Sequence, residues 1–210
     1  MTPADRIRKL VADGRIGEAE GARLLAALET ARPLAKLDPF ERLGGGIAAA
    51  IGVAGAGASI AITRLGASFD GALDLHIGRV PTLGAAVLQQ VASFVVPAVL
   101  FWAYARSRNA HVRLLDFFGM VGLGRLPVIL GALPMIWLAP PEPASVNDIH
   151  FTPALLLVAF LAFVMLGLQI ALSFFGFRNA SNLSGKALGI GFAVMLLVAE
   201  IASKLVLFIH

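Results

Sequence analysis

Long apolar runs separated by short polar breaks dominate the chain from residue 43 onward. Five of these runs are long enough to cross a hydrocarbon core about 30 Å thick, which takes about 20 helical residues. They lie at 43–63, 82–104, 118–138, 153–175 and 186–208. Each break between them holds charges, turn-forming residues or both. This pattern predicts an all-α fold, a polytopic integral membrane protein built as a five-transmembrane-helix bundle.

The first 42 residues have a different pattern, which predicts a separate helical hairpin (1–42) ahead of the transmembrane domain (43–210). Two short helices are expected on either side of Asp13-Gly14-Arg15, each with one apolar face. These faces are formed by Ile7, Leu10 and Val11, and by Leu24, Leu25 and Leu28. The stretch LVADGRIGEAEGARLLAAL resembles the short helical modules of SHOCT type, and this resemblance implies an oligomerisation or protein-contact element. An amphipathic hairpin lying on the membrane surface is the alternative.

Composition supports the membrane assignment. Hydrophobic residues make up 58% of the chain and charged residues only 14%, whereas soluble domains are about 45–50% apolar. With this composition, a soluble fold would have too few polar residues to cover its apolar surface. The chain contains no cysteine, which excludes disulfides, thiolate metal sites and catalytic thiols.

The positive charges are distributed unevenly over the two sides of the five-span arrangement. Eight of the 17 Lys and Arg residues precede the first run, three lie in the second break and two in the fourth. The first break holds two, and the third break and the C-terminal end hold none. The positive-inside rule therefore predicts a multi-pass protein of the cell (inner) membrane, with its N-terminus cytoplasmic and its C-terminus outside. No nucleic-acid partner is expected, because no motif or aromatic-studded basic face accompanies the charge.

Small residues recur every four positions in the first run, LGGGIAAAIGVAGAGASIAIT. This helix-packing stripe consists of Gly44, Ala48, Gly52 and Ala56. Such stripes let helices approach closely in lipid, so we expect the first span to pack against a neighbour or its own copy. The run is not a phosphate-binding loop, because no Gly-Lys-Ser/Thr follows it. No cofactor is expected.

The stretch GLGRLPVIL (122–130) places Arg125 inside the third run. A charge at mid-membrane costs from about 3 to well above 10 kcal/mol, and snorkelling toward the headgroups would remove much of that cost. The alternative is that Arg125 points into the bundle. Pro127 cannot donate to the carbonyl of Leu123, and the arginine can satisfy that acceptor while pairing with an acid on another helix.

Glu200 in the fifth run is the acid that such a pairing would use. Lys204 follows it by four residues on the same helical face, so a local Glu200–Lys204 pair is one interpretation. The other is a cross-helix network of Arg125, Pro127, Glu200 and Lys204. Ionisable residues inside a membrane often mark ion or proton routes, which keeps a transporter hypothesis open. No matched pair of broken spans indicates the inverted repeat of many transporters.

Two Asp-x-His patterns fall in breaks that are expected on the outer side. A candidate polar site on this face consists of Asp70, Asp74, His76, Asp148 and His150. Histidine with carboxylate suits zinc or a similar divalent ion. The simpler interpretation, which assigns no metal, is an interfacial helix with Asp70, Asp74 and His76 on its wet face. Its lipid-facing residues would be Phe69, Leu73 and Ile77.

Two longer phrases resemble a known family. FDGALDLHIG (69–78) follows the first span, and RLLDFFGMVGLGRLPVIL (113–130) leads into the third. With five spans behind a cytoplasmic N-terminus, they resemble the bacterial branch of the Yip family, polytopic membrane proteins named in eukaryotes for interacting with Ypt/Rab GTPases. This resemblance covers roughly residues 40–209 and implies a role in vesicle traffic or membrane organisation.

Enzymatic activity is not expected, because the chain has no HExxH or GxSxG motif and no paired catalytic carboxylates on a span. The sequence therefore favours a non-enzymatic membrane protein of Yip type. Its expected partners are membrane lipids and either another protein or a second copy of this chain, bound through the N-terminal hairpin. The alternative is a small-solute or ion transporter, or a permease component, that uses Arg125 and Glu200. A membrane-bound metalloenzyme ranks below both.

Overall fold

The structure is a computed structural model, which describes residues 3–35, 38–78, 80–139 and 151–208. It divides the chain into two compact units, residues 1–42 and residues 43–210. Each unit is described separately below.

The N-terminal unit contains two packed helices, α1 (Pro3–Ala12) and α2 (Glu18–Ala35), followed by the 3-10 helix η1 (Pro39–Glu41). Gly14 lies in the turn after α1 with a φ of +66°, a backbone conformation that glycine adopts without strain. Gly21 is buried against the side chain of Val11. The apolar side chains of α1 remain half-exposed, so this unit buries little apolar surface by itself.

The second unit contains the spans predicted from the sequence. Its five long helices are α3 (Gly45–Thr63), α4 (Leu83–Arg108), α5 (Leu114–Leu138), α6 (Pro153–Ser181) and α7 (Gly185–Phe208). Within the described residues these are the helices long and apolar enough to cross a membrane. The predicted all-α, five-span architecture is confirmed. Helices α4, α5 and α6 each extend several residues beyond the predicted runs. Helix α6 ends where Asn182 adopts a left-handed φ of 53°, a common way to end a helix.

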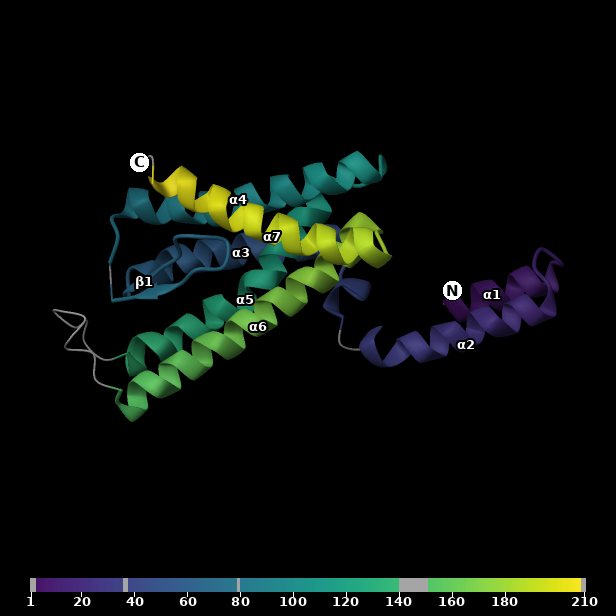
Figure 1. Cartoon of the computed structure of the whole chain (residues 1–210), viewed down its shortest axis with the longest axis horizontal. Coiled ribbons are helices and arrows are strands. Elements are labelled where there is room, and N and C mark those ends of the chain that lie inside the picture. The colour runs from purple at the N-terminus through teal and green to yellow at the C-terminus, as the bar shows by residue number, and fades with distance from the viewer. Residues whose placement is uncertain (1–2, 36–37, 79, 140–150, 209–210) are drawn as a thin grey trace. The chain divides into compact units, whose positions relative to one another are not determined.

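Helix α5 lies at the centre of this unit. It packs along both α3 and α6 and also contacts α4, while α4 packs against α7. Figure 1 shows α5 beside α6 and α4 beside α7. Helix α5 is the most buried span and α6 the least, so the apolar surface of α6 is available to lipid.

Small residues form the contact between α3 and α5. Ala48 and Gly52 are buried, and an added Cβ at Gly52 would collide with the backbone of Gly122. Gly119 of α5 lies in the same way against Ala48. The other stripe positions differ: Gly44 precedes the helix as its exposed N-cap residue, and Ala56 is half-buried. The neighbour of the stripe in this structure is therefore α5.

Four phenylalanines, one from each of α4 to α7, form an aromatic cluster in the core. Their ring centroids lie 5.1 to 6.3 Å apart in the pairs that include Phe177, which is the range of favourable aromatic packing. The aromatic cluster consists of Phe101, Phe117, Phe177 and Phe192.

The connection between α3 and α4 is a short hairpin. Strand β1 (Ala67–Ser68) pairs antiparallel with β2 (His76–Ile77), in the register Ala67 to Ile77 and Ser68 to His76. Residues 69–75 between the strands are called the hairpin loop. The end of the helix bundle at which this loop lies is called the hairpin end. The strands and hairpin loop lie alongside the helices in Figure 1.

The hairpin contradicts the predicted interfacial helix. Phe69, expected to face lipid, is fully buried at 0% exposure, in an apolar core with residues of α3 and α5. The segment forms a strand pair instead, and Gly66 and Gly78 at its open end have φ values of +105° and +116°, which glycine adopts without strain. The N–H of Gly78 donates to the carbonyl of Gly66 at 2.8 Å and closes the hairpin.

Candidate functional site

Arg125 is buried at 5% exposure and points into the bundle. Its Nη1 donates to the carbonyl oxygens of Ser93, at 2.6 Å, and of Gly71, at 3.3 Å. The guanidinium carbon also lies 5.5 Å from the ring centroid of Phe69, a cation–π distance. The arginine thus joins α5 to α4 and to the hairpin loop, rather than reaching outward as the snorkelling interpretation requires.

The acceptor on α4 is a carbonyl that a proline has left free. Pro97 lies inside α4 and has no N–H to donate to the carbonyl four residues earlier, that of Ser93. The sequence predicted this kind of partner for Arg125 but placed it at Leu123, because Pro127 is closer along the chain. Pro127 is half-buried within α5, and the bonds of the guanidinium go to α4 and the hairpin loop instead. The predicted acceptor was therefore wrong.

Helix α7 holds the other side of the hairpin loop. The carboxylate of Glu200 accepts the N–H of Leu73 at 2.8 Å, and the hydroxyl of Ser203 accepts the N–H of Ala72 at 3.0 Å. Gly71 lies so close to the Glu200 carboxylate that an added Cβ would come within 2.6 Å of its oxygen. Only a glycine leaves room for this approach.

Glu200 and Arg125 do not form the direct ion pair that the sequence suggested. Among the described residues, Lys204 is the ion-pair partner of Glu200, at 3.3 Å, and it also pairs with Asp74 at 2.5 Å. The local Glu200–Lys204 pair is therefore present, and Asp74 is a further partner of the lysine. Arg125 and Glu200 come together indirectly, because they bind Gly71 and Leu73 of the same loop.

Gln169 completes the set from α6. It is 3% exposed, and its Nε2 donates to the carbonyl of Ala72 at 2.7 Å. The loop clamp, as we call the side chains that bind the hairpin loop from α5, α6 and α7, consists of Arg125, Gln169, Glu200 and Ser203. Irregular backbone inside a membrane protein needs such partners, because lipid supplies none. Sequence reasoning missed Gln169 and Ser203, although each is a polar residue inside an apolar run.

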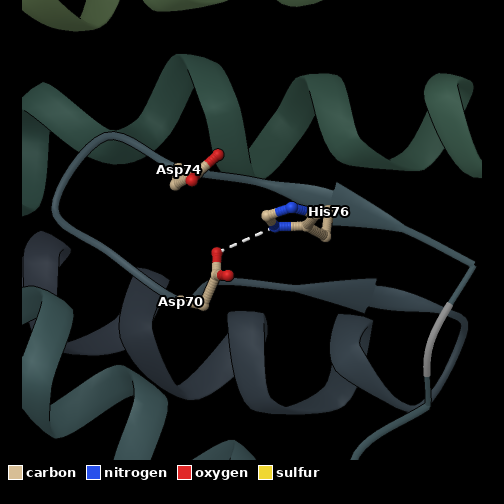
Figure 2. Close-up of side chains that lie close together, drawn as sticks. All are labelled: Asp70, Asp74 and His76. Atoms are coloured by element: carbon tan, nitrogen blue, oxygen red, sulfur yellow. Dashed lines mark hydrogen bonds and ion pairs between the residues drawn. The ribbon is translucent and has the colours of Figure 1, made fainter. Parts of the chain in front are cut away.

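A charged cluster consists of Asp70 and Asp74 of the hairpin loop and His76 at the start of β2. The Nδ1 atom of His76 lies 2.9 Å from the carboxylate of Asp70. Figure 2 shows the imidazole ring turned toward Asp70, with Asp74 close by. The other members of the predicted polar site, Asp148 and His150, lie outside the described residues.

Asp74 is held as a carboxylate. Partial burial raises its pKa, but a hydrogen bond from Lys204 and the charges of His76 and Lys204 outweigh burial, so the pKa lies below its ordinary value. The two carboxylate oxygens have separate partners: Oδ1 accepts the N–H of Leu75 at 3.1 Å and Oδ2 accepts from Lys204. The carboxylate is therefore available as an anion under ordinary conditions.

A cleft of about 730 Å³ lies between the start of α4 and the end of α7. Its polar lining comes from Asp70, Thr82, Gln89 and Lys204, and the rest is mostly apolar side chains of both helices. Gln89 donates through Nε2 to the hydroxyl of Ser68 at 3.2 Å. Its Oε1 is buried and has no hydrogen-bond donor among the described residues, which is unusual for a buried acceptor.

Comparisons with protein-family models, with curated proteins and with solved structures found no match for this chain. The resemblance to the Yip family and that of the N-terminal segment to SHOCT modules therefore rest on the sequence phrases alone. What the site can do follows from its geometry: neutral and charged side chains hold a loop, and Asp70 of the charged cluster lines a cleft.

Proposed function

We propose that this protein is a non-enzymatic membrane protein of Yip type, which acts in membrane organisation or trafficking through protein or lipid partners. The loop clamp is the observation that carries the proposal. Arg125, Gln169, Glu200 and Ser203 each bind a backbone group of the hairpin loop. Intramembrane polar side chains used in this way fix a fold. They are not left free to bind a solute or to relay a proton.

The N-terminal unit is the proposed site of partner binding or self-association. Its helices bury little apolar surface against each other, and Leu24 remains 43% exposed. A unit of this size gains stability by contacting something else. Deleting residues 1–32 should leave membrane insertion intact and change either the co-purifying proteins or the oligomeric size. Unchanged partners and size would reduce this unit to a passive surface hairpin.

The proposed location is the cell (inner) membrane, with the N-terminus cytoplasmic and the hairpin end outside. The bias of thirteen Lys and Arg residues against two between the sides supports this orientation. Because the chain has no cysteine, single cysteines report it cleanly. A cysteine at Asn182 should react only from the cytoplasm and one at Val80 only from outside, and the reverse pattern would refute the orientation.

Transport is the second candidate, and the cleft favours it. It combines carboxylate, amide and ammonium groups with enough volume for a small solute. A solute route would have to pass the clamped loop, so transport requires that the loop be released during each cycle.

One pair of experiments separates the two functions. Crosslinking in native membranes followed by co-purification should recover the same protein or lipid partner repeatedly if the Yip-type proposal holds. Purified protein in liposomes should then show no solute flux above that of empty liposomes. Flux that falls when Arg125 is replaced, with no recurrent partner, would instead establish the transporter.

A further inference from the structure

The charged cluster brings three metal-ligand groups together. One ligand atom each from Asp70, Asp74 and His76 can be chosen so that all three lie within 4.8 Å of one another. All three residues belong to the one hairpin, as Figure 2 shows. A single ion at the middle of such a triangle would be within ordinary coordination distance of each ligand after small side-chain rotations.

The loop clamp fixes the spacing of these ligands. Arg125, Gln169, Glu200 and Ser203 bind residues 71–73, and Asp70 and Asp74 lie on either side of that segment. The strand pairing of Ser68 with His76 holds the third ligand. Preorganisation of this kind lowers the cost of binding an ion, because the backbone carrying the ligands is already ordered.

Charge favours a cation at this position. The ammonium group of Lys204 contacts the carboxylates of Asp74 and Glu200, and a third carboxylate, that of Asp70, lines the same cleft as this lysine. Arg125, which also binds the hairpin loop, donates to two backbone carbonyls. Carboxylates in excess of nearby cations attract a further positive charge.

The cleft reaches the charged cluster at Asp70. Gln89 lines the same cleft and binds the hydroxyl of Ser68 through Nε2. The cleft also leaves space for solvent or anionic ligands on the open side of the ion.

We propose that Asp70, Asp74 and His76 form a binding site for a divalent transition-metal ion of the zinc class. An imidazole with two carboxylates suits Zn²⁺ better than Ca²⁺ or Mg²⁺, which prefer oxygen ligands alone. Lys204 competes with the ion for Asp74. When the ion binds, the lysine moves off Asp74 and stays with Glu200, its second partner at 3.3 Å.

The site is tested with Zn²⁺ alone, added to the full-length protein in detergent after removal of any histidine tag. Titration calorimetry should give one ion per chain, and Zn²⁺ should raise the thermal unfolding temperature. His76→Gln removes a ligand and should weaken Zn²⁺ binding at least about tenfold. Replacing a residue that only hydrogen-bonds to a metal ligand already costs that much. The matched control is His111→Gln, an exposed histidine in the connection from α4 to α5, which should leave binding unchanged.

Lys204→Met provides the second variant, and its effect has the opposite sign. Removing the ammonium group that competes for Asp74 should tighten Zn²⁺ binding. If Lys204 only supported the fold, its removal would leave Zn²⁺ affinity unchanged or lower. His76 is exposed at 55% of its side chain, so its replacement should not unfold the protein. Failure of the wild type to bind Zn²⁺, or equal binding by wild type and His76→Gln, would overturn the proposal. These Zn²⁺ measurements are independent of the co-purification experiment that tests the proposed Yip-type function.

Discussion

The aromatic cluster joins α4 to α7, and the loop clamp joins three of these helices directly and reaches α4 through the carbonyl of Ser93, which Arg125 binds. On each of the four helices a polar residue, either a clamp residue or Ser93, lies eight positions closer to the hairpin end than the phenylalanine of the aromatic cluster. The pairs are Phe101 and Ser93, Phe117 and Arg125, Phe177 and Gln169, and Phe192 and Glu200. Eight residues correspond to roughly 12 Å along a helix. The bundle therefore has two layers, one of aromatic rings and one of polar groups around a loop.

The two layers should respond differently to substitution. Ring packing has little directionality, so another apolar side chain of similar volume can fill the space. In the polar layer each donor has a particular acceptor, and removing one member leaves its buried partner unsatisfied. A small chemical change should therefore cost more at the loop clamp than a larger change of shape costs at the aromatic cluster.

Arg125→Leu should give the largest effect. It leaves the carbonyls of Gly71 and Ser93 without the arginine donor and leaves Lys204 as the cation that contacts Glu200. We expect the free energy of unfolding to fall by about 3–5 kcal/mol, as for other disrupted buried charge networks. Thermal or denaturant-induced unfolding in detergent measures this loss.

The control for this prediction is Arg108→Leu, because Arg108 is exposed and lies over the ring of Tyr104. It should change stability by less than about 1 kcal/mol. Glu200→Leu added to Arg125→Leu should cost less than the sum of the single changes, because both residues hold the same loop. Strictly additive losses would show that the two residues act separately.

Gly71→Ala should be the next largest change. The new Cβ would come within 2.6 Å of the Glu200 carboxylate, so the loop or Glu200 must move, at a cost of up to about 3 kcal/mol. Gly84→Ala is the matched control, because an added Cβ there has no neighbouring atom within 4 Å. Equal stability of the two variants would mean that the loop accommodates a side chain at residue 71.

Gln169→Leu and Phe177→Leu compare the layers directly, on one helix and with one new residue. Gln169→Leu keeps the size of the side chain but leaves the carbonyl of Ala72 unsatisfied, which we expect to cost about 2 kcal/mol.

Phe177→Leu removes ring contacts but introduces no polar mismatch, and we expect a loss of about 1 kcal/mol. The comparison of layers fails if Phe177→Leu is the more destabilising of the two in the same unfolding assay.

Acidification should give the smallest effect. Since the pKa of Asp74 is lowered on folding, its contribution to stability is present above its unfolded pKa, near 3.8. That contribution is lost as the pH falls through the lower folded value. Partly exposed ion pairs contribute less than about 1 kcal/mol. Asp74→Asn should flatten the stability profile below pH 4, and an unchanged profile would show that the Lys204 contact does not stabilise the fold.

The spans and the close contact of the first helix follow from the sequence, because both depend on local properties. An apolar run of about 20 residues has few alternatives to a helix across a bilayer. Small residues spaced four apart on a helix allow close approach to whatever lies there. The sequence did not identify α5 as that neighbour, since Gly119 and Gly122 come from a distant segment.

The sequence predicted the type of group that Arg125 binds, a carbonyl freed by a proline, but not which residue provides it. A buried arginine near proline-containing helices suggests that it binds a carbonyl freed by a proline, and the structure has that arrangement. The helices α4 and α5 contain Pro97, Pro127 and Pro134, and sequence proximity favoured Pro127. The packing of α4 against α5 selects Pro97 instead, because it brings Ser93 next to the guanidinium.

The hairpin loop was decided by tertiary structure alone. Phe69, Leu73 and Ile77 are spaced four apart, a local pattern that suits a helical face. The bonds that hold the loop join residues from 54 to 131 positions apart in the sequence. Local hydrophobic periodicity carries no information about such contacts. The chain therefore determines its membrane-spanning helices locally, whereas the polar interior exists only when α5, α6 and α7 assemble around the loop and satisfy its backbone.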